Sequence, residues 1–334
     1  MAKFGVRLLT DDDADAHRAL WESSARLLPQ HPGFVRAVGL STGSPVLGVF
    51  AGTELRGAVG FSARRGKQLR AWTNPHFAPW SGVLVSTEDA ERPGAKGEKF
   101  WRDVYSAIAT WKAPAADLIE MIAAPGHGDL RGLTWNGWDG RVHYNYVSRW
   151  VEEGGWRERL DSATRRQARK AEDSGIEIRF VSPKETGLLQ KLWLLNAEKQ
   201  SLDGNLAEGL ARLGHWIAES DRGFIAAAVE RDTNEWQSAA LIGHDAHRVY
   251  YLVGASDPAR LGTGAPTLLH REVLAEIDRR ALPKCYDWVG ANTPNIVRFK
   301  QGFGPELEML AAARLVSSGK ARALTAVRKV LNFE

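Results

Sequence analysis

Short apolar runs with the period of a β-strand alternate along the chain with longer stretches that have the period of an α-helix. The helical period is clearest in residues 97–111, where Phe100, Val104, Ile108 and Trp111 fall on one stripe. The alternation runs through both halves of the chain, which predicts two α/β domains. The predicted strands are residues 46–51, 56–62, 69–73, 82–85, 118–122, 142–151, 176–180, 223–231, 238–243, 248–253, 285–289 and 306–316. The predicted helices are residues 12–27, 31–40, 97–111, 128–136, 182–200, 206–218, 267–280 and 294–302, with another inside 153–174 and a basic tail or helix at 321–331.

The composition is that of a globular protein of two domains. The chain has 334 residues, of which 44% are apolar, so each half can bury a core. No run reaches the roughly 18 apolar residues that a membrane-spanning helix needs, and residues 1–9 lack the apolar core of a signal peptide. We therefore expect a cytoplasmic protein. Cys285 is the one cysteine, which excludes an internal disulfide and a cysteine-based metal site.

One stretch, residues 286–304, combines features of a site. Its first residues have the composition of a buried strand, and a turn leads to a short basic helix that begins near Pro294. Gly302 and Gly304 end this helix. The stretch therefore places a lysine and an aromatic ring, Lys300 and Phe299, beside a glycine-bounded turn.

The sequence GANTPNIVRFKQGFG, preceded by CYDWV, resembles the C-terminal segment of Fem-type transferases, which are two-domain relatives of the GNAT acyltransferases. The resemblance covers residues 156–316 and is weaker in the N-terminal half. The family transfers amino acids from aminoacyl-tRNA to amines, typically in peptidoglycan precursors; some similar proteins act in peptide or nucleoside antibiotic pathways, and others use acyl-CoA. The resemblance implies an α/β (α+β) protein with two tandem GNAT-like domains, each with a mixed sheet flanked by helices. Residues 1–152 would form the acceptor side and residues 153–334 the donor and catalytic side.

In the family, the Phe-Lys pair of this segment lies at the reaction centre, which implies catalytic roles for Phe299 and Lys300. An amine that attacks an activated ester needs alignment and a stabilised oxyanion, and a lysine ammonium can supply the positive charge. The alternative for Lys300 is a surface lysine on a capped helix. Asp287 is a candidate general base by its position, and a structural or capping role is its alternative.

A basic helix at residues 165–175, RRQARKAEDSG, resembles one that Fem-like proteins carry at the domain junction. Its cations stack at i, i+4, where like charges repel, so an anionic partner would relieve the repulsion. We therefore expect contacts with tRNA phosphates. The alternative is a solvated face balanced by Glu172 and Asp173. The expected tRNA-binding residues are Arg165, Arg166, Arg169, Lys170 and Arg298.

Four residues are expected to bind the acceptor. The resemblance places Arg36 and Lys199 near positions where the family holds a cation for the acceptor's phosphates. Tyr251, one of two adjacent strand tyrosines, can direct its hydroxyl to a substrate. Trp80 belongs to a proline-rich loop that lines the acceptor site in one interpretation and is an ordinary aromatic anchor in the other.

The segment SDPARLGTGAP bears on the use of acyl-CoA, because CoA enzymes hold pyrophosphate on a Gln/Arg-x-x-Gly-x-Gly/Ala loop through backbone N–H groups and a helix N-terminus. Gly262 and Gly264 fit this pattern. Ala259 stands where the cation belongs, and Arg260 comes one position late. The loop therefore leaves CoA possible without supplying its usual cation.

We expect an aminoacyltransferase that forms an amide by moving an amino acid from aminoacyl-tRNA to an amine of a peptide, a peptidoglycan precursor, or a nucleoside or peptide antibiotic. The alternative is a GNAT N-acyltransferase that uses acyl-CoA, and a third possibility is a non-catalytic RNA-binding module. Neither a bound cofactor nor a metal is expected; His244 and His247 are three residues apart without an obvious third ligand. The expected partners are aminoacyl-tRNA and a small amine acceptor, and we expect a monomer. The net charge of +4 permits tRNA without requiring it.

Overall fold

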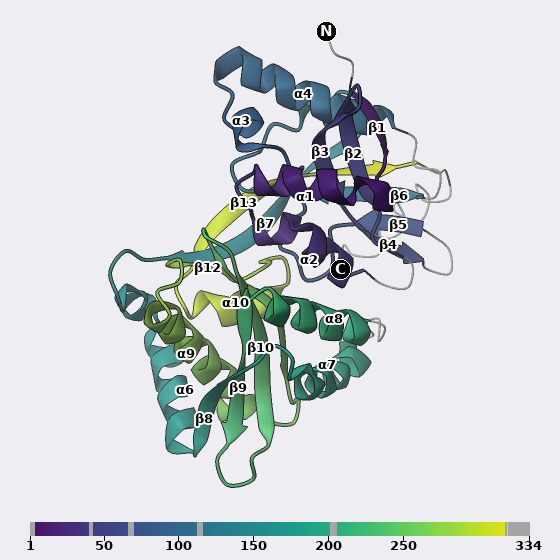
Figure 1. Cartoon of the computed structure of the whole chain (residues 1–334). Coiled ribbons are helices and arrows are strands. Elements are labelled where there is room, and N and C mark those ends of the chain that lie inside the picture. The colour runs from purple at the N-terminus through teal and green to yellow at the C-terminus, as the bar shows by residue number, and fades with distance from the viewer. Residues whose placement is uncertain are drawn as a thin grey trace. The chain divides into compact units, whose positions relative to one another are not determined.

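The computed structural model describes residues 4–39, 43–65, 70–111, 116–200, 206–317 and 319, without the side chains of residues 65 and 196–200. The chain forms two compact units, each of which is described by itself (Figure 1). Unit 1 consists of Met1–His143 and Met309–Glu334, and unit 2 consists of Tyr144–Glu308. The division falls inside two long strands, β7 (Asp139–Arg149) and β13 (Glu306–Val316). It differs from the expected domains 1–152 and 153–334 because the end of β13 pairs with a strand of unit 1.

Unit 1 contains an antiparallel sheet in the order β1-β2-β3 and the strands β4-β5-β6-β13 of a second sheet. In the second group only β5 and β6 are parallel. Its core packs strand residues against α4, with Val104 and Leu133 fully buried. The strands are β1 (Gly5–Leu8), β2 (Val46–Ala51), β3 (Glu54–Gly60), β4 (Ser62–Arg65), β5 (Arg70–Thr73) and β6 (Leu118–Ile122). The helices are α1 (Ala14–Glu22), α2 (Pro32–Ala37), α3 (Thr87–Ala90), α4 (Gly94–Thr110) and α5 (Arg131–Thr134), with the 3-10 turns η1 (Asp11–Asp13) and η2 (Leu28–Gln30).

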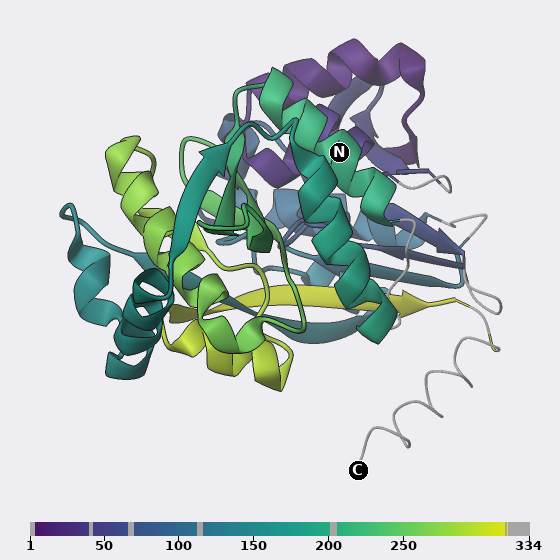
Figure 2. The ribbon, with the colours of Figure 1, turned by 90° about the horizontal axis from the view of Figure 1, so that it is seen from below.

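Unit 2 contains a mixed sheet in the order β7-β12-β11-β10-β9-β8, in which only β11 and β12 are parallel. Helices α7 and α8 cover one face, and α6 and α9 cover the other (Figures 1 and 2). The strands are β8 (Ile176–Val181), β9 (Gly223–Glu230), β10 (Trp236–His244), β11 (Val249–Ser256) and β12 (Cys285–Asp287). The helices are α6 (Ser162–Asp173), α7 (Thr186–Gln200), α8 (Leu206–Glu219), α9 (Ala265–Arg279) and α10 (Pro294–Gln301), with the 3-10 turns η3 (Gly155–Arg159) and η4 (Leu261–Thr263).

The two parallel strands of unit 2 pair over a short distance and then separate. Val249 pairs with Tyr286 and Tyr250 with Asp287, after which β11 continues to Ser256 while β12 ends. A bulge accompanies the separation, because the register between β10 and β11 shifts at Leu241 and Ile242. Bulges bend a strand and often occur beside functional sites. The separation leaves space next to the carboxyl-terminal part of β11.

Most predicted elements occur within a few residues of their predicted positions, and β13 matches its prediction at both ends. Several elements differ from the prediction. A strand, β1, precedes the first helix, and that helix ends at Glu22, well before residue 27. Residues 82–85 form a single bridge, Ala58 with Leu84, where a strand was expected. Strand β12 ends at Asp287, because the next residues turn away. The tail expected at 321–331 lies outside the described residues.

Within the part of the chain that the structure describes, no helix is both long enough and apolar enough to cross a bilayer.

Candidate functional site

A pocket of about 620 Å³ occupies the space where β11 leaves β12. Strands β10 and β11 supply one wall, and the start of α9 and the exposed side of α10 supply others. Much of its surface is apolar. The polar side chains that reach it include Gln167 from α6, Tyr251, His270, Asn295 and Lys300. Elements far apart in the sequence thus place a few polar groups around an apolar pocket, as in many ligand sites.

Lys300 lies in the last turn of α10 and is only 3% exposed. Its ammonium group donates hydrogen bonds to the carbonyl oxygens of Trp288 (2.5 Å), Val289 (2.7 Å) and Gly290 (2.7 Å). These bonds use the three N–H donors of an ammonium group. Burial lowers the pKa of Lys300 to about 8, against the smaller opposing effect of Asp287. The alternative of a solvated surface lysine is therefore wrong.

The carbonyls that Lys300 binds belong to a turn with unusual backbone geometry. Val289 has φ of 51° and Gly290 has φ of 82°, in the left-handed region that a β-branched residue rarely adopts. Two side chains also hold this turn. Asp287 accepts from the backbone N–H of Val289 (2.9 Å), and Asn145 accepts from that of Gly290 (2.7 Å). Strain of this kind persists only where the surroundings fix it, and it is common at functional sites.

Phe299 and Tyr251 contribute rings to the pocket around a buried histidine. His270 is 2% exposed, and its ring lies edge-on to Tyr251 (4.5 Å between centroids) and Phe299 (5.7 Å). Burial lowers the pKa of His270 to about 3, and the charge of Lys300 acts in the same direction. His270 is therefore neutral at physiological pH. The Lys300 ammonium lies 5.8 Å from the centre of the Tyr251 ring.

Asp287 is fully buried and does not line the pocket. One carboxylate oxygen accepts from Asn145 and Val289, and the other lies 3.3 Å from Arg248. Burial raises its pKa, although Arg248 opposes this effect. The geometry gives Asp287 the structural role that was its alternative.

The loop before α9 offers backbone donors without a free cation. Among the described residues, the N–H groups of Gly262 and Gly264 have no acceptor. Arg260 bonds to Glu230 and Glu235 at 2.7 Å each, and it lies 3.7 Å from Asp257. Three carboxylates therefore surround the cation nearest to this loop.

The basic residues of α6 form an exposed surface next to the pocket. Thr164, Ala168 and Ala171 face the core, so the four cations expected to bind tRNA point outward. None of these four, nor Arg298 on α10, makes an ion pair within the described part of the chain, whereas Glu172 bonds to Arg271 at 3.1 Å. Glu172 therefore pairs with Arg271 and does not neutralise the basic face. The four residues are Arg165, Arg166, Arg169 and Lys170.

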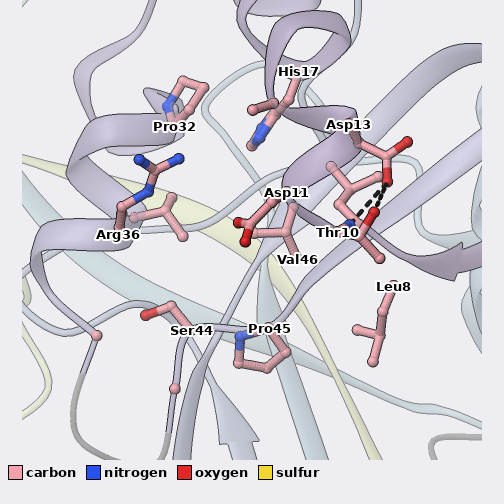
Figure 3. A pocket seen from close by; sticks show the side chains of 15 residues that line it. Leu8, Thr10, Asp11, Asp13, His17, Pro32, Arg36, Ser44, Pro45 and Val46 are labelled. Atoms are coloured by element: carbon pink, nitrogen blue, oxygen red, sulfur yellow. Dashed lines mark hydrogen bonds between the residues drawn. The ribbon is translucent and has the colours of Figure 1, made fainter.

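Two of the remaining predicted acceptor contacts, Arg36 and Trp80, belong to unit 1. Arg36 lines a second pocket of about 620 Å³, inside unit 1 (Figure 3). Trp80 is fully buried and lines neither pocket. Lys199 lies in the last turn of α7, and its side chain is outside the described residues. Tyr251 lines the pocket of unit 2 together with Lys300.

Sequence reasoning missed His270 and Gln167. His270 falls on the buried stripe of α9 with Val273 and Ile277, so its burial was predictable from helical spacing. Gln167 lies among the cations of α6, and its hydrogen bond to Thr267 (3.1 Å) required knowledge of the packing of α6 on α9.

Comparisons with known proteins agree on the fold. No protein-family model matches the sequence, and no curated protein matches it. Among solved structures, FemX is similar over 92% of this chain and 96% of its own, with a TM-score of 0.60 and 12% identity. A tandem GNAT protein from the clavulanic acid biosynthesis pathway covers 94% of this chain and 99% of its own, with a TM-score of 0.55 and 12% identity. L-PGS from Bacillus licheniformis covers 94% of each, with a TM-score of 0.53 and 10% identity.

These identities relate the proteins by fold. The chain has a tandem GNAT-like fold, similar to those of FemX and the clavulanic acid protein, which confirms the predicted fold class. The Fem-type resemblance is confirmed at the same level.

Proposed function

We propose that this protein is an aminoacyltransferase that moves an amino acid from aminoacyl-tRNA to an amine of a peptide, a peptidoglycan precursor, or a nucleoside or peptide antibiotic. Unit 2 binds the donor and unit 1 binds the acceptor. The observation that carries the proposal is the basic face of α6, whose cations pair with no described residue, beside a pocket that the same helix lines through Gln167. A tRNA bound to that face would place its aminoacylated end near Lys300.

The reaction has a simple balance. The neutral amine attacks the ester carbonyl, the C–N bond forms, and the bond from the carbonyl carbon to the ribose oxygen breaks. The nitrogen loses one proton, and the ribose oxygen takes one. Negative charge develops on the carbonyl oxygen in between, and a fixed positive charge nearby stabilises it.

Lys300 supplies this charge, and Phe299 shapes the wall beside it. The ammonium already donates to three carbonyls, so one of these hydrogen bonds must break before the group can donate directly to the oxyanion. The charge acts on the oxyanion without such exchange, because Lys300 is only 3% exposed and its charge is poorly screened. Tyr251 presents a hydroxyl with no hydrogen-bond partner in the described ranges and can orient the substrate.

The alternative donor is acyl-CoA. The N–H groups of Gly262 and Gly264 favour it, since they have no acceptor among the described residues and border a pocket that Leu261 and Pro266 line. The carboxylates around Arg260 oppose it, because they would repel pyrophosphate.

A donor screen separates the candidates. Purified protein is incubated with an amine mixture and either labelled aminoacyl-tRNAs or labelled acetyl-CoA, with and without RNase. We expect RNase-sensitive amide formation from the tRNA pool. Thiol release that RNase does not affect supports acyl-CoA, and RNA binding without turnover supports the non-catalytic module. Arg166→Gln combined with Lys170→Gln should raise the KM for tRNA, whereas Lys184→Gln, an exposed lysine away from α6, is the matched control.

A further inference from the structure

The pocket in unit 1 has a lining unlike that of the pocket beside Lys300. It lies between η1, the start of α1, α2 and the residues before β2, and its volume is about 620 Å³ (Figure 3). Leu8, Pro32, Val35, Pro45 and Val46 give it apolar walls. Charged side chains of both signs reach it from two sides, so it can contact both a negative and a positive group of a ligand.

One carboxylate and one guanidinium group in this pocket are available to a ligand. Asp13 is engaged, because both its oxygens accept from Arg7 (2.6 and 2.7 Å) and one accepts from the backbone of Thr10 (2.8 Å). Asp11 and Arg36 are both exposed, and neither makes an ion pair with any described residue. Figure 3 shows the carboxylate of Asp11 and the guanidinium of Arg36 directed into the same space. Opposite charges that share a pocket without touching leave room for a molecule between them.

His17 adds a polar group that the fold does not satisfy. It is 9% exposed, and no described residue hydrogen-bonds to its ring, which points into the pocket (Figure 3). Burial lowers its pKa to about 4, and the charge of Arg36 acts in the same direction while Asp13 opposes it. A neutral imidazole offers one donor and one acceptor. Because no described residue bonds to it, the ring is available to a ligand in the pocket.

We propose that this pocket binds a small zwitterion of the amino-acid type, with its carboxylate on Arg36, its ammonium on Asp11 and a hydrogen bond to His17. A carboxylate fits better than a phosphate, because one free arginine balances a single negative charge and Asp11 would repel a second. The apolar walls hold a short aliphatic side chain.

The identification of the zwitterion as the acceptor rests on the proposed function, whereas the binding of a zwitterion in this pocket does not. The ammonium held by Asp11 stays protonated, because a neighbouring carboxylate favours the charged form. It is therefore a recognition group and not the attacking nitrogen. The acceptor would be a diamino acid, whose second amine is the one that is acylated.

The test measures binding to the full chain by calorimetry, without a donor. The probes are L-norleucine, which carries both charges, hexanoate, which carries only the carboxylate, and pentylamine, which carries only the ammonium. Norleucine should bind about tenfold more tightly than either, since each charged hydrogen bond contributes roughly that factor. The aminophosphonate analogue of norleucine should bind more weakly than norleucine; tighter binding would overturn the carboxylate assignment.

Two variants assign the charges. Arg36→Gln should weaken norleucine and hexanoate about tenfold and leave pentylamine unchanged, and Asp11→Asn should weaken norleucine and pentylamine and leave hexanoate unchanged. The neighbouring Asp12→Asn and the exposed Arg18→Gln on α1 are matched controls that should alter none of the three. Equal losses for all probes, or no binding of norleucine, would overturn the proposal. Because no donor is present, this outcome is independent of whether tRNA-dependent transfer is found.

Discussion

The ammonium group of Lys300 donates a hydrogen bond of 2.7 Å to the carbonyl oxygen of Gly290, ten residues earlier in the chain. Gly290 has a left-handed backbone, as does Val289, whose carbonyl accepts from the same group. Helix α10 therefore fixes the turn that precedes it. Lys300 combines a charge at the pocket with a structural bond that the resemblance to a transferase segment did not imply.

Replacement of Lys300 should lower stability as well as activity. Lys300→Met keeps the length of the side chain but leaves buried carbonyls without a donor, so we expect a loss of about 2 to 3 kcal/mol. Urea denaturation measures it. Lys184→Met, at an exposed position, should stay within about 0.5 kcal/mol of the parent protein. An unchanged midpoint for Lys300→Met would show that the three hydrogen bonds contribute no net stability.

The rate of amide formation should depend on pH through Lys300. Its pKa is lowered by burial to about 8, so the ammonium form predominates below that pH and the neutral amine above it. If the charge stabilises the oxyanion, kcat falls as the pH rises through about 8. His270, whose pKa is about 3, remains neutral over this range and does not contribute. A kcat that rises through the same pH would instead make Lys300 a general base.

Gly254 should tolerate no side chain while Tyr251 holds its present position. A Cβ at residue 254 would lie 1.7 Å from the Tyr251 hydroxyl oxygen and 2.4 Å from the ring carbon that carries it. Gly254→Ala must displace the ring and should cost about 1 to 3 kcal/mol by thermal denaturation. Adding Tyr251→Ala should recover part of this loss, because the clash disappears. Gly262→Ala, where a Cβ meets nothing within 4 Å, is the control and should show no loss.

Arg248 should stabilise the charged forms of the two carboxylates beside it, those of Asp287 and Glu308. It bonds to Glu308 (2.9 Å) and lies 3.3 Å from the fully buried Asp287. Arg248→Met leaves both acids without this partner and should cost about 3 kcal/mol in chemical denaturation. Asp287→Asn in the same background should restore part of the stability, since the buried charge is then gone. If the second substitution adds to the loss, the cost does not come from an uncompensated carboxylate.

RNA binding should depend on salt through the basic face of α6. Each phosphate contact that Arg166→Gln or Lys170→Gln removes should lower the slope of log affinity against log salt by about 0.7 to 0.9. Binding of charged tRNA at several salt concentrations measures the slope. The same variants should keep the parent's thermal midpoint, because both side chains are exposed and unpaired among the described residues. A slope that does not change would remove α6 from the tRNA contact.

The fold was predicted correctly where residues close together in the sequence determine the helix or strand. Helix α10 begins at Pro294, which suits a first helical turn, and β6 and β13 have the predicted bounds. The failures have local causes too. Residues 82–85 are apolar like a strand, yet their backbone is used for a single bridge. Strand β1 was missed because it has only four residues, too few for its alternation of exposed and half-buried positions to stand out.

The candidate site was predictable only in part. The Phe-Lys pair and the α6 cations followed from a resemblance, and the structure places Lys300 in a pocket with Tyr251. The roles of His270, Gln167 and Asn145 depend on partners that lie far away in the sequence. Asn145, for example, accepts from Gly290, which lies 145 residues later.

The sequence by itself determined most of the order of helices and strands and the exposed character of α6, because hydrophobic periodicity depends only on residues within a few turns of each other. The tertiary structure decided which charges have partners. It buried the ammonium of Lys300 among three carbonyls, surrounded Arg260 with acids, and left Arg36 and Asp11 without ion pairs within the described residues. The physical reason is that the partners of a charge, and its exposure to water, are set by elements that meet only when the chain has folded.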